Sequence, residues 1–237
     1  MPAHFLVLVP YPASAGAPPP PPPGLTGPCD YKVTWRPLPV AMAADRGYAD
    51  AALEDLAVMA AAQNEDSGIF NAVIVDSLGD GGVAALRSVL HLLVVGSGKV
   101  AALHALTLGT RFSFLVHSRA AAMCLRSELR QWRIEAHCAS VRVVEPDAGA
   151  LRDAALRCAT DDGAEVLILG SSAYAPFAAD LAELLDIPLI SPLPLACEIA
   201  AALLAAGLSH SRGAAPAPRV IKLPVLDAMA RAMREAG

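Results

Sequence analysis

Short apolar runs alternate with helical segments along most of this chain. Strands that are buried between two layers of helices are apolar throughout, whereas strands with one face in water alternate apolar and polar residues. Continuous runs such as Ala72–Val75 therefore favour parallel sheets that helices cover on both faces, as in an α/β protein. The predicted strands are His4–Val9, Tyr31–Arg36, Ala72–Val75, Leu92–Val95, Phe112–Val116, Ser140–Val144, Glu165–Leu169 and Pro188–Ile190.

The predicted strands form two blocks with the same order of strands and helices. The blocks meet near residues 108–111, so the pattern indicates an internal duplication into two four-stranded parallel-sheet domains. We predict a first α/β domain over residues 1–108, with a proline-rich loop at 12–28, and a second over 109–212. Residues 213–237 are expected to form a loop and a helix that returns to the first domain.

Composition and charge exclude several classes of protein. The net charge is -5 and no dense Lys/Arg block occurs, so neither a nucleic acid nor a membrane surface is expected as a partner. The five cysteines are scattered without CxxC spacing, which argues against a zinc site and a disulfide framework. Free thiols fit a reducing compartment, and no secretory or membrane-spanning segment is expected, so we predict a cytoplasmic location.

Small polar side chains follow the predicted strands at the edge where parallel sheets bind ligands. They are Asp76, Ser77, Ser97, His117, Ser118, Ser171, Ser172 and Ser191. Ligands of open parallel sheets lie beyond the carboxyl ends of the strands, and the helices that follow present free N–H groups to anions. A small molecule with a carbonyl or carboxylate group is therefore the expected ligand. A serine at such a junction can equally cap the helix that follows it.

Several segments resemble the Asp/Glu/hydantoin racemase superfamily, in particular its hydantoin racemase branch. They are NAVIVDSLGDGG at 71–82, VVGSG at 94–98, GTRFS at 109–113, GAEVLILGS at 163–171, IPLISP at 187–192 and GLSHS at 207–211. The resemblance implies two domains related by a pseudo-twofold axis, with the active site in the cleft between them. It also implies a reaction without a cofactor and assembly into a homo-oligomer.

The resemblance also marks where this chain departs from the family. In the racemases, one cysteine from each domain faces the substrate α-carbon, so that one thiolate removes a proton and the other thiol delivers one. Ser77 and Ser171 stand at these two positions, and a serine hydroxyl is a much weaker acid than a thiol. Val9–Pro12 replaces the family's Asn-Pro-Asn motif. Lys99 stands where Glu is common, and His117 stands where Thr is common.

Three functions are consistent with these departures. The first is a cofactor-independent isomerase or racemase-like enzyme that acts beside a carbonyl or carboxylate, or a decarboxylase, lyase or cyclase derived from one. The second is a racemase inactivated by an engineered exchange of cysteine for serine, and the third is a natural binding protein with a dead site. The predicted catalytic residues are Ser77, Ser171, His117 and Asp76. The predicted substrate-binding residues are Tyr11, Asp80, Ser97, Ser118, Ser172 and Tyr174.

The two aspartates of the loop after Val75 have alternative roles. Asp76 and Asp80 are predicted to orient the imidazole of His117, which titrates near neutral pH. Asp80 is alternatively predicted to cap the helix that begins near Gly82. No set of metal ligands is predicted.

Overall fold

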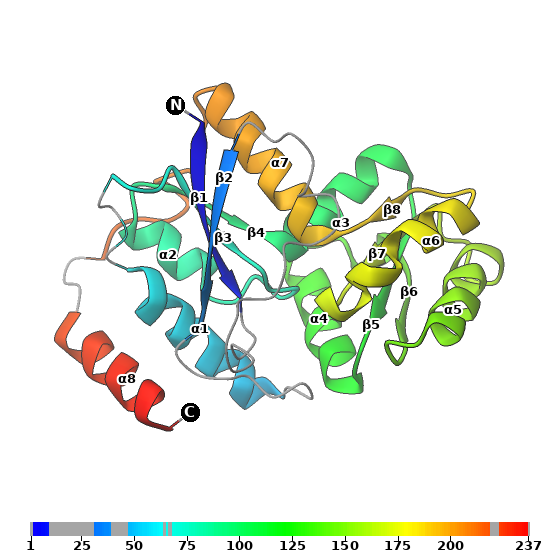
Figure 1. Cartoon of the computed structure of the whole chain (residues 1–237), viewed down its shortest axis with the longest axis horizontal. Coiled ribbons are helices and arrows are strands. Elements are labelled where there is room, and N and C mark those ends of the chain that lie inside the picture. The colour runs from blue at the N-terminus through cyan, green and yellow to red at the C-terminus, as the bar shows by residue number, and fades with distance from the viewer. Residues whose placement is uncertain are drawn as a thin grey trace.

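The computed structural model describes residues 2–9, 31–38, 47–63, 65, 68–218 and 223–236. Its strands are β1 (Ala3–Val9), β2 (Tyr31–Pro37), β3 (Ala72–Val75), β4 (Leu93–Gly96), β5 (Phe112–Val116), β6 (Cys138–Val143), β7 (Val166–Leu169) and β8 (Leu189–Ile190). They form two four-stranded sheets of order β2-β1-β3-β4 and β6-β5-β7-β8 (Figure 1). Every pairing in both sheets is parallel, which confirms the predicted α/β fold with two similar sheets.

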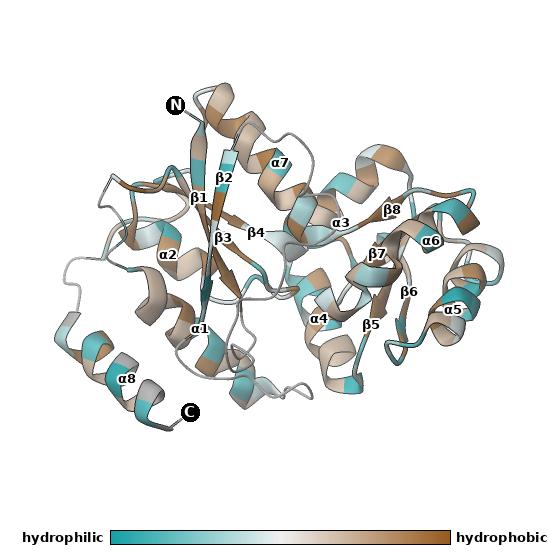
Figure 2. Cartoon of the chain, in the orientation of Figure 1, coloured by the Kyte–Doolittle hydropathy of each residue, from teal (hydrophilic) through white to brown (hydrophobic). Residues whose placement is uncertain are grey.

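The helices follow the strands in the order that the sequence predicts. They are α1 (Tyr48–Ala62), α2 (Val83–Val89), α3 (Ser97–Leu108), α4 (Arg119–Gln131), α5 (Ala148–Thr160), α6 (Ala178–Leu184), α7 (Pro192–Ala205) and α8 (Leu223–Ala236), with short 3₁₀ helices η1 (Glu135–His137) and η2 (Ser172–Phe177). Strands β3, β4, β7 and β8 have no polar side chain, whereas polar residues occur along the edge strands β2 and β6 (Figure 2). Strands β2 and β6 are also less buried than β3, β4 and β7, because an edge strand can have more contact with water.

Two helices each cover the sheet of the other half of the molecule. Helix α3 follows β4 of the first sheet, but Ala101 and Ala105 pack against β5 and β7 of the second. Helix α7 follows β8 of the second sheet, but Ala196 and Ala200 pack against β1 and β3 of the first. The two helices also contact each other in the middle of the molecule.

This exchange changes where the halves divide. The predicted boundary at residue 108 places α3 with the first sheet, and the boundary at residue 212 places α7 with the second. In the structure the chain enters the second half directly after Gly96 and leaves it directly after Ser191. Local periodicity does not show which sheet a helix covers, because an Ala-rich helix fits either one.

The remaining helices pack on the sheet of their own half. Helices α1 and α2 cover one face of the first sheet, and α4 and α5 lie on opposite faces of the second. Helix α8 lies beside α1 (Figure 1), where Met229 packs against the core that α1 shares with the first sheet. Within the described parts of the chain, no helix is both long and apolar enough to cross a membrane.

Candidate functional site

Two adjoining pockets lie between the halves, at the carboxyl ends of the strands. The small pocket has a volume of about 60 Å³ and is lined by Asp76, Leu78, Ser97, Leu169, Gly170, Ser171, Ser172, Ala175, Ser191, Pro192, Leu193 and Pro194. The large pocket has a volume of about 290 Å³ and is lined by Ala51, Ala52, Glu54, Asp55, Ser77, Leu78, Gly79, Gly81, His117, Ala121, Cys124, Leu125, Glu128 and Gly170. Their position matches the rule that parallel sheets bind ligands beyond the ends of their strands.

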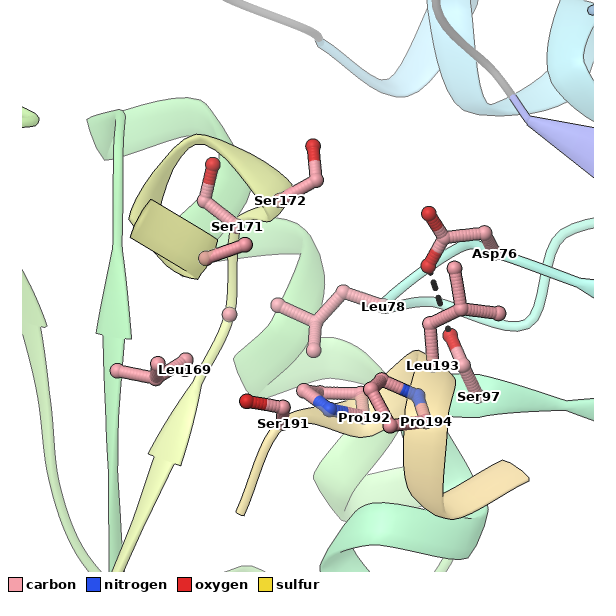
Figure 3. A pocket seen from close by; sticks show the side chains of 12 residues that line it. Asp76, Leu78, Ser97, Leu169, Ser171, Ser172, Ser191, Pro192, Leu193 and Pro194 are labelled. Atoms are coloured by element: carbon pink, nitrogen blue, oxygen red, sulfur yellow. Dashed lines mark hydrogen bonds between the residues drawn. The ribbon is translucent and has the colours of Figure 1, made fainter. Parts of the chain in front are cut away.

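The small pocket gathers hydroxyl groups and one carboxylate. Figure 3 shows Asp76 and Ser97 from the first sheet opposite Ser171 and Ser172 from the second. The Ser97 hydroxyl donates a long hydrogen bond of 3.5 Å to Asp76 Oδ1. The Ser171 hydroxyl accepts the N–H of Ala173 at 3.3 Å, so it caps η2 and can still donate its own proton.

The start of α7 contributes shape more than hydrogen-bond donors to the small pocket. Pro192 and Pro194 lack an N–H group, and the N–H of Leu195 donates to the Ser191 carbonyl. Among the described residues, the side chains that can form hydrogen bonds in this pocket are the serine hydroxyls and the carboxylate of Asp76.

The large pocket combines Ser77 and His117 with three carboxylates. Glu54 and Asp55 come from α1, and Glu128 comes from α4 of the other half. Burial raises the pKa of Glu128, and the nearby negative charge of Asp55 raises it further. Among the described residues no lysine or arginine lines this pocket, so this part of its wall favours a neutral or positively charged group over an anion.

Leu78 separates the two pockets. Leu78 and Gly170 line both of them, and Figure 3 shows the Leu78 side chain between Asp76 and Ser171. Gly170 leaves space for this side chain, because a Cβ there would lie 3.0 Å from Leu78 Cδ2 and 2.7 Å from the Leu115 carbonyl oxygen. Ser77 and Ser171 thus line two neighbouring pockets on the two sides of Leu78.

Most of the other predicted site residues have defined places. Ser97 and Ser172 line the small pocket together with Asp76 and Ser171. Ser118 lines neither pocket, and its hydroxyl caps α4 by accepting the N–H of Ala121 at 3.0 Å. Tyr11 lies outside the described residues.

Asp80 does not have either of its predicted partners. It lines neither pocket, and its carboxylate accepts the N–H groups of Gly98 at 2.9 Å and Lys99 at 3.2 Å. It therefore caps α3, and the prediction that it caps the helix beginning near Gly82 is wrong. The N-cap of that helix is Gly82 itself, without a side-chain cap. Because the Asp80 carboxylate is held on α3, it does not orient His117.

Tyr174 belongs to the core of the second half and not to a pocket. Its side chain is fully buried among the residues between the second sheet and α5. Its hydroxyl donates to the Val144 carbonyl oxygen at 2.5 Å, and burial raises the pKa of the phenol. The predicted contact of Tyr174 with substrate is therefore corrected to a structural role.

Replacing Tyr174 by phenylalanine is expected to weaken folding without affecting the site. The change removes the donor and leaves the Val144 carbonyl without this hydrogen bond, which costs about 1–2 kcal/mol in the free energy of unfolding. Urea denaturation measures this loss, with Tyr48→Phe as the control because Tyr48 is exposed. A weaker affinity for substrate at unchanged stability would contradict the structural role.

Three acidic residues of the large pocket come from helices and were not predicted from the strand ends. Glu54 and Asp55 lie in the middle of α1, and Glu128 lies near the end of α4, at positions where charged residues ordinarily face water. One signal was present in the sequence, since Glu54 lies on the apolar face of an Ala-rich helix. Leu78 was missed because an apolar residue carries no chemical signal of its position.

Four of the five cysteines are described, and no disulfide joins any of these four. Cys158 and Cys197 are buried in the core, and burial raises the pKa of Cys138 to about 11. Cys124 lines the large pocket. Cys29 lies outside the described residues. No group of three or more metal-ligating side chains occurs in the part of the chain that is described.

Comparison with known proteins agrees with the fold. The family model for Asp/Glu/hydantoin racemases matches residues 26–200, which is most of the chain. The chain belongs to this family. It is 25% identical over 177 residues to a hydantoin racemase of Rhizobium meliloti, which covers 70% of this chain and 73% of that protein.

Solved structures of this family share the fold. The allantoin racemase from Klebsiella pneumoniae superposes with a TM-score of 0.77 at 21% identity, over 92% of this chain and 95% of that one. An arylmalonate decarboxylase superposes with a TM-score of 0.58 at 15% identity, over 84% of this chain and 92% of that one. At these identities the two structures establish the common architecture.

Proposed function

We propose that the chain is a cofactor-independent racemase-like enzyme that moves a proton on the carbon beside a carbonyl group of a small molecule. The observation that carries the proposal is the placement of one titratable group on each side of Leu78. His117 lines the large pocket and Asp76 lines the small one. A substrate in the cleft would then have a base on each of its two faces.

The roles of the residues follow from the chemistry of their side chains. A hydroxyl group is a poor base without a partner, whereas imidazole and carboxylate groups are common general acids and bases. In the proposed reaction one of His117 and Asp76 removes the α-proton, and the electron pair of the C–H bond moves onto the carbonyl as an enolate. The other group, which carries a proton at the start, gives that proton to the opposite face of the carbon as the electron pair of the enolate returns to the carbon and the carbonyl re-forms. Ser77 and Ser171, at the family's two cysteine positions, would donate hydrogen bonds to substrate oxygens.

A neutral cyclic amide suits the charges better than a dianion. The large pocket approaches the volume typical of ligand sites, about 300 Å³, and the acidic groups that line it in the described part of the chain are Glu54, Asp55 and Glu128. A malonate, which carries two negative charges, would be repelled by Glu54, Asp55 and Glu128. The ring of a hydantoin or of allantoin is a neutral diamide with one acidic C–H group, so it fits this pocket without that cost. Racemisation is therefore the proposed reaction, ahead of decarboxylation.

Exchange of the substrate α-proton in D₂O tests the proposal. Separate enantiomers of 5-benzylhydantoin, 5-methylhydantoin and allantoin are incubated with the protein at pH 7, and proton NMR follows the loss of the C–H signal. The expected result is exchange faster than the protein-free rate for at least one of these compounds. Exchange at the protein-free rate for all three would contradict the proposed function.

His117→Ala separates the two faces of the reaction. With two opposed bases, this variant should lose racemisation but keep exchange for the one enantiomer whose α-proton faces Asp76. The expected fall in the rate for the other enantiomer is about 10²–10⁴-fold, the usual contribution of a positioned acid or base. Equal rates for both enantiomers, as in the unchanged protein, would show that His117 does not transfer the proton.

A further inference from the structure

The loop that carries Ser77 is tied to the start of α3 by one side chain. Asp80 lies three residues after Ser77, and its carboxylate accepts the N–H groups of Gly98 and Lys99, which lie 18 and 19 residues further along the chain. The first N–H groups of a helix have no carbonyl partner within the helix, so they require an acceptor from outside. Asp80 supplies that acceptor for the second and third residues of α3.

Glycines at two positions make this contact possible. A Cβ on Gly96 would lie 2.2 Å from Asp80 Cγ, so the carboxyl group lies directly against the end of β4. A Cβ on Gly98 would lie 2.0 Å from the Leu78 carbonyl oxygen, so the loop backbone is equally close to α3. Asp80 has a φ of 53°, in the left-handed region that Asp and Asn adopt more readily than most residues.

We propose that Asp80 is a positioning residue that holds Ser77 and Leu78 in place by fixing their loop on the start of α3. The same contact sets the distance between the ends of β3 and β4, from which Asp76 and Ser97 enter the small pocket. The importance of this position for catalysis rests on the proposed function, but the contact and its role in ordering the loop do not. Asp80 acts through other residues and does not touch the substrate.

The charge on Asp80 makes this contact sensitive to pH. Arg87 of α2 and Lys99 of α3 are the charged groups that act on it, and both favour its ionised form. Burial outweighs them and the two N–H bonds, and raises the pKa of Asp80 from 3.8 to about 6. Protonation weakens charge-assisted hydrogen bonds, so the hold on the loop should loosen as the pH falls through about 6.

Protonation of Asp80 has the opposite effect on the stability of the whole fold. Because the pKa of Asp80 is higher in the native state, the native state binds this proton more tightly than the unfolded chain does. The contribution of Asp80 to stability is therefore greatest below pH 3.8 and is lost as the pH rises through about 6. Asp80→Asn should remove this part of the pH dependence, because the amide does not ionise.

Three variants at this position test the inference. Asn keeps an oxygen acceptor and tolerates the left-handed backbone, Ala removes the acceptor, and Gly removes the acceptor while relieving any backbone strain. Amide hydrogen exchange by NMR at pH 7.5 is expected to change least in Asp80→Asn, whose uncharged amide oxygen can still accept both N–H groups. The amides of Gly98 and Lys99 should exchange at least about 10-fold faster in Asp80→Ala and Asp80→Gly, since each loses a protecting hydrogen bond.

Catalysis provides a second measurement on the same variants. A misplacement of about 1 Å costs about 10²-fold in rate, so kcat should fall by about that factor in Asp80→Ala and Asp80→Gly, with a smaller change in KM. Asp80→Asn should keep more of kcat than Asp80→Ala or Asp80→Gly, and should lose the step near pH 6 in the unchanged protein's pH profile. If no tested compound reacts, the proposed function fails, while the amide measurement still decides the role of Asp80.

Two results would overturn the inference. Unchanged amide protection at Gly98 and Lys99 in both Asp80→Ala and Asp80→Gly would show that the carboxylate does not fix the loop. A wild-type rate of amide exchange in Asp80→Gly alone would show that backbone conformation, and not the carboxylate, orders it.

Discussion

Replacing Asp76 by asparagine is expected to abolish racemisation and to slow α-proton exchange for one enantiomer by about 10²–10⁴-fold. Asparagine has nearly the same shape as aspartate, so the small pocket and the contact with Ser97 should persist. The enantiomer that loses exchange should be the one that His117→Ala leaves reactive, because the two groups lie on opposite sides of Leu78. Proton NMR in D₂O with each separate enantiomer measures both rates.

The comparison between the two single variants makes this prediction specific. Asp153→Asn is the control, since Asp153 is exposed on α5 and lines neither pocket, so kcat should stay unchanged. A loss of the same enantiomer in Asp76→Asn and in His117→Ala would mean that both groups act on one face. That outcome would contradict the two-base arrangement.

Gly98→Ala is expected to lower the free energy of unfolding by about 3 kcal/mol or more, or to prevent folding. Alanine at an ordinary helical position is favoured over glycine by about 1 kcal/mol, but here the added Cβ would lie 2.0 Å from the Leu78 carbonyl oxygen. A backbone oxygen cannot move aside without displacing the loop that carries Ser77. Circular dichroism during urea denaturation measures the change.

Gly149→Ala is the matched control for this substitution. Gly149 is the second residue of α5, as Gly98 is the second residue of α3. Its Cβ would meet Asp147 Oδ1 at 3.3 Å, and this exposed capping side chain would need to shift by only a few tenths of an ångström. Stability should therefore stay the same or rise slightly. Equal effects of the two substitutions would show that the loop does not approach α3 as closely as the structure has it.

The strands and their order could be predicted because the signal is local. A buried parallel strand such as β3 or β7 is a continuous apolar run, and repetition of the same sequence of runs indicates two similar sheets. The same reasoning finds the strand ends, and so it finds Asp76, Ser77, His117 and Ser171 near the pockets. These four residues are polar and directly follow apolar strands, or lie one residue further on, which is the signal that the sequence offers.

The remaining features depend on contacts between distant segments. Ser118, Tyr174 and Asp80 have the right chemistry for a site, yet their partners are respectively a helix N–H, a buried carbonyl and the start of α3. The spacing of residues along the sequence does not show which groups they contact. The acidic lining of the large pocket could not be predicted for the same reason, because Glu54 and Glu128 come from different halves of the molecule.

Because α3 and α7 are exchanged between the halves, the chain crosses between the halves at the cleft. The chain passes from one half to the other at Gly96–Ser97 and returns at Ser191–Pro192, and three of these four residues line the small pocket. Each half relies on a helix that begins in the other, so neither sheet would be covered on both faces if the halves were produced separately. A molecule bound at these two crossings therefore contacts the segments that join the halves. Any rotation of the halves about these segments would open or close its binding site.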